Sequence, residues 1–225
     1  MVLQHSPSGL EARSVTDDLI NKLTANLKPV APRAMHQLLL RYATGGIAGG
    51  LAIMLGFLGA RHDLLSVMTT AAYWMKFGYA ALLLILLIPA LFTLSRPVRA
   101  ELHWRPLAIL LACFASAALI QLMNAEPEQA EVLIWGQTAL VCPWLIVLIA
   151  LPTLTLLLVA MRRLAPANPA LTGLAAGIVA GAVGVLIYSL HCPESGMPFI
   201  VIWYTLGVAI TGFLGMIGGR VFLHW

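Results

Sequence analysis

Six long apolar stretches dominate this sequence and decide what it can fold into. Each is long enough to cross about 30 Å of hydrocarbon as a helix, which takes about 20 residues. The stretches are residues 38–59, 71–94, 106–123, 138–161, 170–190 and 198–223. Polar, turn-like connectors separate them at residues 61–63, 95–105, 124–137, 162–169 and 191–197. The pattern predicts an all-α, polytopic membrane protein with six transmembrane helices.

Composition argues against a water-soluble globular protein. Hydrophobic residues make up 60% of the chain and charged residues only 10%, and the mean hydropathy is +0.92. A soluble protein of this size keeps a charged surface, so lipid is the solvent that suits this much apolar side chain. The net charge of +4 is not gathered into a basic run interleaved with aromatic residues. We therefore expect no direct binding of nucleic acid.

Basic residues predict the orientation in the membrane, because Lys and Arg near helix ends stay in the cytoplasm. With the N-terminus inside, only Arg61 and Lys76 lie toward the outside. The other basic residues then fall on the inner side: Arg13, Lys22, Lys28, Arg33, Arg41, Arg96, Arg99, Arg105, Arg162, Arg163 and Arg220. The sequence predicts a multi-pass membrane protein with both termini in the cytoplasm.

Glycines recur at four-residue spacing in three of the apolar stretches. They are Gly45, Gly46, Gly49 and Gly50 in the first, Gly173, Gly177 and Gly181 in the fifth, and Gly215 and Gly219 in the sixth. Such stripes let membrane helices approach closely, either within one bundle or between two chains. We favour packing within one bundle, which leaves the oligomeric state open.

The membrane domain, residues 38–225, follows a polar arm of residues 1–37. The arm has no apolar core followed by a small-residue cleavage site, so we expect no signal peptide and assign targeting to the first membrane helix. Residues 1–13 are rich in Ser, Pro and Gly among other polar residues, and this composition predicts a disordered tail.

A short amphipathic helix is predicted over residues 14–28 of the arm. Thr16 is placed to cap its N-terminus, Asp17 and Asp18 fall in its first turn, and Pro29 ends it. The apolar positions that share one face are Leu19, Ile20, Leu23 and Leu27. Alone, a helix of this length is marginal in water, so that face needs a groove on a partner or a membrane surface.

The polar face of this helix decides between the two alternatives. It carries Lys22 and Lys28 against two aspartates, which is a poor match to an anionic leaflet. We therefore favour capture of a protein partner over a helix that rests on lipid.

The three cysteines differ in where the predicted topology places them. Cys142 opens the fourth stretch and Cys192 lies in the loop after the fifth, so both fall at the outer face. Cys113 lies inside the third stretch among Ala, Leu and Phe, where we expect a small buried hydrophobic residue with no functional role. The chain has no CxxC motif and no Cys/His spacing typical of a zinc site.

Two thiols at one interface allow more than one chemistry. With His191 and Met197 close in sequence, Cys142 and Cys192 could form a disulfide or offer soft ligands to a thiophilic metal. An inert pair of apolar cysteines fits the residues equally well, because thiol reactivity depends on exposure.

Catalysis and transport find little support in the sequence. It contains no HExxH, GxSxG, P-loop or GxGxxG motif, and we expect no enzyme. Charges inside membrane helices normally mark transport pathways, yet the centres of these stretches carry none, and Lys76 lies near the outer end of the second.

Taken in order along the chain, several segments resemble the NrsF family of membrane anti-sigma factors. The resemblance runs nearly end to end and is most specific in the Leu-His-Cys-Pro-Glu segment of residues 190–194. The other carriers are residues 16–20 and 27–30 of the arm, Cys142-Pro143, residues 168–170, and residues 199–204.

This resemblance implies a function. It implies a protein of the bacterial inner membrane whose cytoplasmic arm binds an extracytoplasmic-function sigma factor and releases it on a heavy-metal or oxidative signal. The two outward cysteines of the family match Cys142 and Cys192, which would receive the signal and could hold a soft metal ion transiently, with no resident cofactor. We assign sigma-factor binding to Asp17, Asp18, Leu19, Ile20, Leu23 and Leu27. The alternative is a small transporter or membrane-assembly component with incidental cysteines.

Overall fold

The computed structural model describes residues 9–25, 33–97 and 103–223, with side chains from residue 17 onward. The chain divides into two compact units, Met1–Ala34 and Met35–Trp225, and each is described by itself below. Within the described residues, all regular structure is helical.

Among the described residues, six helices are long and apolar enough to cross a membrane, which confirms the predicted fold class. They are α2 (Ala34–Ile53) with the π-helix η1 (Met54–Leu58), α4 (Ala71–Leu94), α5 (Arg105–Met123), α7 (Cys142–Arg162), α8 (Pro169–Tyr188), and the run α9 (Met197–Phe199), η2 (Ile200–Tyr204) and α10 (Thr205–Phe222). Their bounds lie close to the predicted ones because hydrocarbon thickness fixes the length of each apolar stretch.

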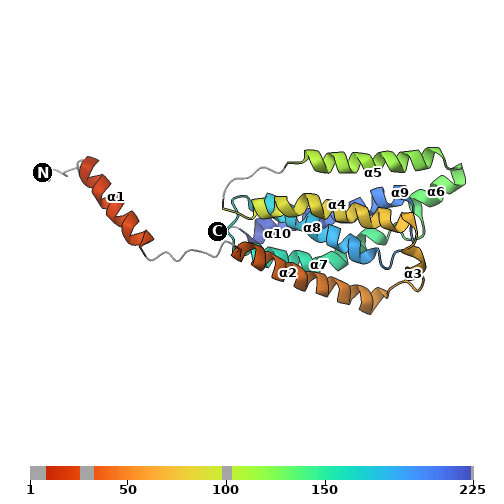
Figure 1. Cartoon of the computed structure of the whole chain (residues 1–225), viewed down its shortest axis with the longest axis horizontal. Helices are drawn as coiled ribbons and strands as arrows, with labels where there is room; N and C mark the ends of the chain where they lie inside the picture. Colours follow the sequence, from red (N-terminus) through yellow and green to blue (C-terminus); the bar gives the residue numbers. More distant parts are fainter. Residues whose placement is uncertain (1–8, 26–32, 98–102, 224–225) are drawn as a thin grey trace. The chain divides into compact units, whose positions relative to one another are not determined.

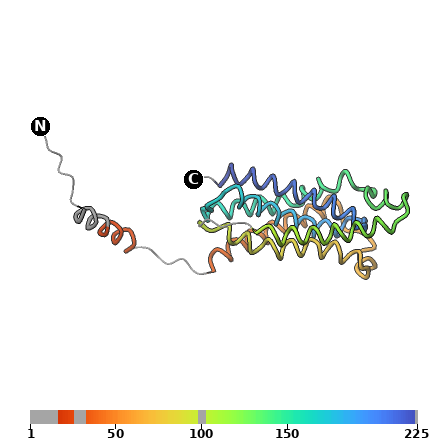
Figure 2. The backbone as a smooth tube through the Cα atoms, turned by 90° about the horizontal axis from the view of Figure 1, so that it is seen from above, coloured from red at the N-terminus to blue at the C-terminus, as the bar shows by residue number. Residues whose placement is uncertain are grey.

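Helix α8 forms the centre of the bundle and packs against α4, α7 and α10 (Figures 1 and 2). Its glycines face the glycines of α10: a Cβ added at Gly173 would collide with the backbone of Gly215 and Gly219, and one at Gly177 with that of Thr211 and Gly212. Because glycine has no side chain, the two helix backbones are in contact at these positions. The prediction that these stripes pack within one bundle is confirmed for the described chain.

The first glycine stripe serves a different pair of helices. A Cβ at Gly46 would meet the backbone of Thr153, and one at Gly50 would lie 2.6 Å from the carbonyl oxygen of Ile149. Helix α2 therefore crosses α7 at these two glycines.

Helix α5 lies at the edge of the bundle, beside α4 (Figure 1). Only 6% of the residues in its apolar 18-residue segment are buried, compared with 72% in the corresponding segment of α8. Cys113 is consequently exposed on the side of this helix, and the prediction that it is buried is wrong. In a helix that is apolar all round, composition does not indicate which face meets lipid.

The connector predicted over residues 124–137 contains a helix, α6 (Pro127–Trp135). Pro127 occupies its first turn together with Glu128, both of which suit a helix N-terminus, and Gly136 ends it with a φ of 49°. The polar residues at both ends of this segment indicated a loop, but its middle is helical. A four-residue helix, α3 (Leu64–Val67), lies in the connector after η1.

Residues 9–25 of the first unit are described, and they contain the helix α1 (Gly9–Thr24). It begins at Gly9, earlier than the predicted start, so Thr16 lies inside the helix and is not its N-cap. Leu, Glu, Ala and Arg at positions 10–13 are strong helix formers and extend the helix into the tail that we expected to be disordered. Leu27, Lys28 and Pro29 lie outside the described residues.

Candidate functional site

Cys142 and Cys192 lie at the same end of the bundle, which we call the cysteine end. Here α8 finishes, α7 begins, and α3, α6 and α9 gather (Figure 1). Cys142 is the first residue of α7, and Cys192 follows α8 in the 189–196 loop. Both are fully buried free thiols. The structure thus brings together the two cysteines that the predicted topology assigns to one face.

Helix register around Ile146 sets the surroundings of Cys142. A Cβ at Gly184 of α8 would lie 2.8 Å from the Ile146 carbonyl oxygen, and one at Gly207 of α10 would lie 3.0 Å from the Ile146 Cβ. Ile146 therefore fits between two glycines. One helical turn nearer the cysteine end, Cys142 is level with Tyr188 and Tyr204.

Tyr188 and Tyr204 surround the two thiols. Both tyrosines are buried, and their rings lie 6.0 Å apart in a T-shaped arrangement. The Cys192 backbone N–H donates to the Tyr188 carbonyl at 3.0 Å, and the Tyr188 side chain is a close neighbour of both thiols. The Tyr204 hydroxyl is a neighbour of Cys192 but makes no hydrogen bond of good geometry to any described residue. An unpaired buried hydroxyl costs about 1–3 kcal/mol.

Lys76 ties helix α4 to the loop that holds Cys192. Its ammonium is buried near the start of α4 and donates to the carbonyl oxygens of Cys192 at 2.9 Å and Glu194 at 2.8 Å. No ion pair joins Lys76 to a carboxylate in the described part of the chain. A buried cation satisfied by backbone carbonyls in an apolar span is costly, which makes it a candidate functional residue.

Arg61 holds the same loop from the connector after η1. Its Nη1 donates to the Cys192 carbonyl at 3.3 Å, while its Nε pairs with Asp63 Oδ1 at 2.7 Å. The hydrogen bond to Asp63 raises the pKa of Arg61 and lowers that of Asp63. His191 Nδ1 lies 2.9 Å from the Gly59 carbonyl oxygen. The connector after η1 and the loop after α8 are therefore fastened together at Cys192.

Glu194 fixes the other side of the loop. Its Oε1 accepts from the Gln137 backbone N–H at 2.8 Å, next to Gly136. A Cβ at Gly136 would lie 2.5 Å from the Glu194 carboxylate, and its positive φ disfavours other residues as well. This glycine lets the carboxylate reach the backbone between α6 and α7.

The donor set around the thiols is small. Among the described residues, no group of three or more His, Cys, Asp or Glu side chains is placed to hold a metal ion. His191 Nδ1 lies 2.9 Å from the Gly59 carbonyl oxygen. Two thiols with two phenols beside them form the centre of the cysteine end, and a contribution of His191 or Met197 as a soft ligand stays a prediction.

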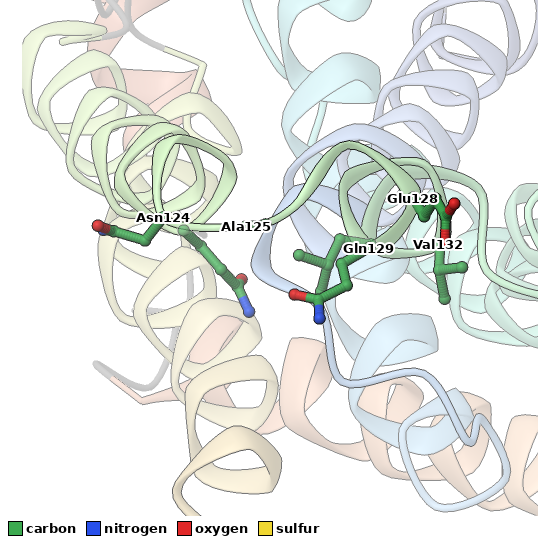
Figure 3. A pocket seen from close by; sticks show the side chains of 7 residues that line it. Asn124, Ala125, Glu128, Gln129 and Val132 are labelled. Carbon is green, nitrogen blue, oxygen red and sulfur yellow. The ribbon is translucent and has the colours of Figure 1, made fainter.

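A shallow concavity of 650 Å³ lies nearby, where α5 leads into α6 (Figure 3). No cysteine lines it. Its walls are Gln121, Asn124, Ala125, Glu128, Gln129, Val132 and Leu133. It is open and carries no convergent set of charged groups, so we do not count it as part of the site.

Sequence reasoning missed the residues that surround the thiols. Lys76 carried a signal, since a single basic residue inside an apolar stretch is unusual. Tyr188 precedes Cys192 by one helical turn, which also places the two side by side. Tyr204 had no such signal, because its approach to Cys192 depends on how α10 packs against α8.

Comparison with known proteins identifies the family. A family model described as NrsF, negative regulator of sigma F, matches residues 23–225. The chain belongs to the NrsF family. The matched NrsF segment contains both cysteines and the whole cysteine end, and it begins within α1.

Two full-length relatives of the NrsF family match over nearly their entire length. The probable anti-sigma-F factor NrsF of Azospira oryzae is 39% identical over 214 residues, which cover 93% of this chain and 99% of the relative. The anti-sigma-F factor NrsF of Caulobacter vibrioides is 36% identical over 213 residues, with the same two coverages of 93% and 99%. No solved structure matches the chain.

Proposed function

We propose that this protein is a membrane-bound anti-sigma factor that sequesters an extracytoplasmic-function sigma factor through its N-terminal arm. Membership in a family of negative regulators of sigma F carries this proposal. The two relatives named as anti-sigma-F factors support it. A binding role also agrees with a sequence that lacks the catalytic motifs sought above.

The exposed apolar residues of α1 are the proposed contact surface. Leu19, Ile20 and Leu23 are 55%, 51% and 65% exposed. At 100° per residue these three fall on one side of the helix, while Asn21 and Lys22 fall on the other. A partner groove that covers the three apolar side chains would remove this surface from water. Asp17 and Asp18 would lie at the edge of such an interface, and Leu27 would extend it beyond the described helix.

Replacing Leu23 by Asp should weaken sigma-factor binding by at least about tenfold, or roughly 1.4 kcal/mol. The reason is that an unpaired carboxylate would be forced into an apolar contact. The measurement is titration of the detergent-solubilised full-length protein with the purified sigma factor in a calorimeter. Asn21→Asp, which adds the same charge on the opposite side of α1, is the matched control and should bind as the native chain does.

Two results would count against this assignment. Equal affinity for Leu23→Asp and the native chain would move the binding surface away from α1. Failure of the native protein to bind any sigma factor encoded beside it would favour the transporter or assembly alternative.

We further propose that the protein lies in the bacterial inner membrane with both termini in the cytoplasm and the cysteine end outside. The asymmetry of basic residues supports this orientation. Alkaline phosphatase fused after Glu194 should be active, and the same fusion after Arg96 or Arg163 should be inactive, because the enzyme matures only outside the cytoplasm. A reversed pattern at Glu194 and Arg163 would overturn the orientation.

The signal is proposed to act at Cys142 and Cys192, as a thiophilic metal ion or an oxidant. Full burial alone would suit inert packing residues. A purely apolar pair, however, gives no reason for two buried phenols beside the thiols. A chemical change at Cys192 would disturb the loop that Lys76 and Arg61 hold, and Lys76 would carry the disturbance to α4.

A further inference from the structure

Two buried side-chain oxygens among the described residues have no hydrogen-bond partner, Thr153 Oγ1 and the Tyr204 hydroxyl, and only the second lies next to a thiol. Its residue is completely buried, and the hydroxyl has no hydrogen-bond partner of good geometry among the described residues. Buried hydroxyl groups in native proteins almost always have partners, so each exception calls for an explanation. Cys192 lies beside it: the Tyr204 ring is 6.0 Å from that of Tyr188, whose carbonyl oxygen accepts from the Cys192 backbone N–H at 3.0 Å.

The adjacent position shows that the fold can satisfy a phenol at this depth. The Tyr79 hydroxyl of α4 is 2.7 Å from the Oγ1 of Thr205, the residue that follows Tyr204. Both tyrosines are buried. One phenol is therefore paired and its near neighbour is not, which argues against a general shortage of polar partners in this part of the bundle.

Local backbone structure also sets Tyr204 apart. It is the last residue of the π-helix η2, immediately before α10. Wide π-turns are rare and cost stability, and they occur frequently at functional sites. The π-helix η2 therefore ends at the residue whose hydroxyl has no partner, and that residue is buried beside the thiols.

We propose that the Tyr204 hydroxyl is a hydrogen-bond donor reserved for the sulfur of Cys192 when that sulfur binds a thiophilic cation. This proposal rests on the proposed role of Cys142 and Cys192 in receiving the signal, and it names Tyr204 as a positioning residue of that site. Two thiols do not supply the four protein ligands of a tetrahedral metal site. They suit a thiophilic ion that is held by two sulfurs, with the phenol as a donor beside one of them.

The chemistry of sulfur explains why the donor is idle in the metal-free protein. A neutral thiol is a weak acceptor. When a soft cation binds, the sulfur–hydrogen bond breaks, a sulfur–metal bond forms, and the proton leaves to water. The sulfur then carries negative charge, and an O–H donor to it forms a short, charge-assisted hydrogen bond. Such donors to metal ligands typically change metal affinity by about 10- to 100-fold.

Tyr204→Phe removes only the hydroxyl and is the test. We would titrate the purified full-length protein with Cd²⁺ and follow the near-ultraviolet charge-transfer absorption of cadmium thiolate. Tyr204→Phe should bind Cd²⁺ about tenfold more weakly than the native chain. Its metal-free form should unfold at the same temperature as the native chain or at a higher one, because no hydrogen bond is lost.

Tyr79→Phe is the matched control, since it deletes a phenol hydroxyl that already has a partner. It should lower the unfolding temperature and leave Cd²⁺ affinity unchanged. A merely structural role for Tyr204 would produce the same pattern in both variants.

Two kinds of result would contradict the proposal. Native Cd²⁺ affinity in Tyr204→Phe, or no Cd²⁺ binding by the native protein, would overturn the role of Tyr204 and leave oxidation of the thiols as a route for the signal. Undiminished Cd²⁺ binding by the Cys142→Ser, Cys192→Ser double variant would instead contradict the proposed metal site itself.

Discussion

Replacing either Cys142 or Cys192 by Ser should abolish release of the sigma factor by a thiophilic metal or an oxidant, while repression without the signal persists. Both thiols are buried at one end of the bundle and share Tyr188 as a neighbour, so neither sulfur alone completes a two-sulfur site or a disulfide. The measurement is sigma-dependent transcription with and without the inducer, at matched levels of the membrane protein.

Cys113→Ser is the matched control for this experiment. It makes the same atomic exchange in a cysteine that is exposed on α5, and induction should stay as it is in the native chain. Full induction in the Cys142→Ser, Cys192→Ser double variant would show that these two residues serve packing alone.

The second large effect is expected at the interface between α8 and α10. Replacing Gly177 by Leu should prevent accumulation of the folded protein, at a cost above about 3 kcal/mol. The added Cβ would collide with backbone atoms of Thr211 and Gly212, which cannot move aside as a flexible side chain would. Thermal unfolding of the detergent-solubilised protein and its yield in membranes are the measurements.

Gly78 supplies the comparison. It lies in α4 with nothing within 4 Å of an added Cβ, so Gly78→Leu should be tolerated and Gly78→Ala should stabilise the helix by up to about 1 kcal/mol. Similar losses in Gly78→Leu and Gly177→Leu would mean that helix contact at Gly177 is not what limits stability.

The number and type of the membrane helices could be predicted because hydrocarbon thickness imposes a length on every apolar stretch. Apolar length does not reveal a short helix in a polar connector, and for that reason α6 was missed between Pro127 and Trp135. It also does not say which side of a uniformly apolar helix faces lipid, so the exposure of Cys113 was predicted wrongly.

The candidate site was predictable only in part. Topology placed Cys142 and Cys192 at one end of the bundle, because each is adjacent to the end of an apolar stretch. Their tyrosine neighbours depend on register, which is set where Ile146 fits against Gly184 and Gly207. No local sequence pattern encodes a contact among three helices, so the place of the Tyr204 phenol became visible only in the folded chain.

The hydrogen bonds of Lys76 do not depend on which side chain stands at position 192. Its ammonium binds the main-chain oxygens of Cys192 and Glu194 and no atom of their side chains. Because every residue has a carbonyl, the anchorage of the loop is independent of the residue type at position 192. The serine variants keep this tie and differ from the native chain at the sulfur atom alone. A change of side chain at position 192 therefore alters the chemistry beside the two tyrosines and leaves the attachment of the loop to α4 in place.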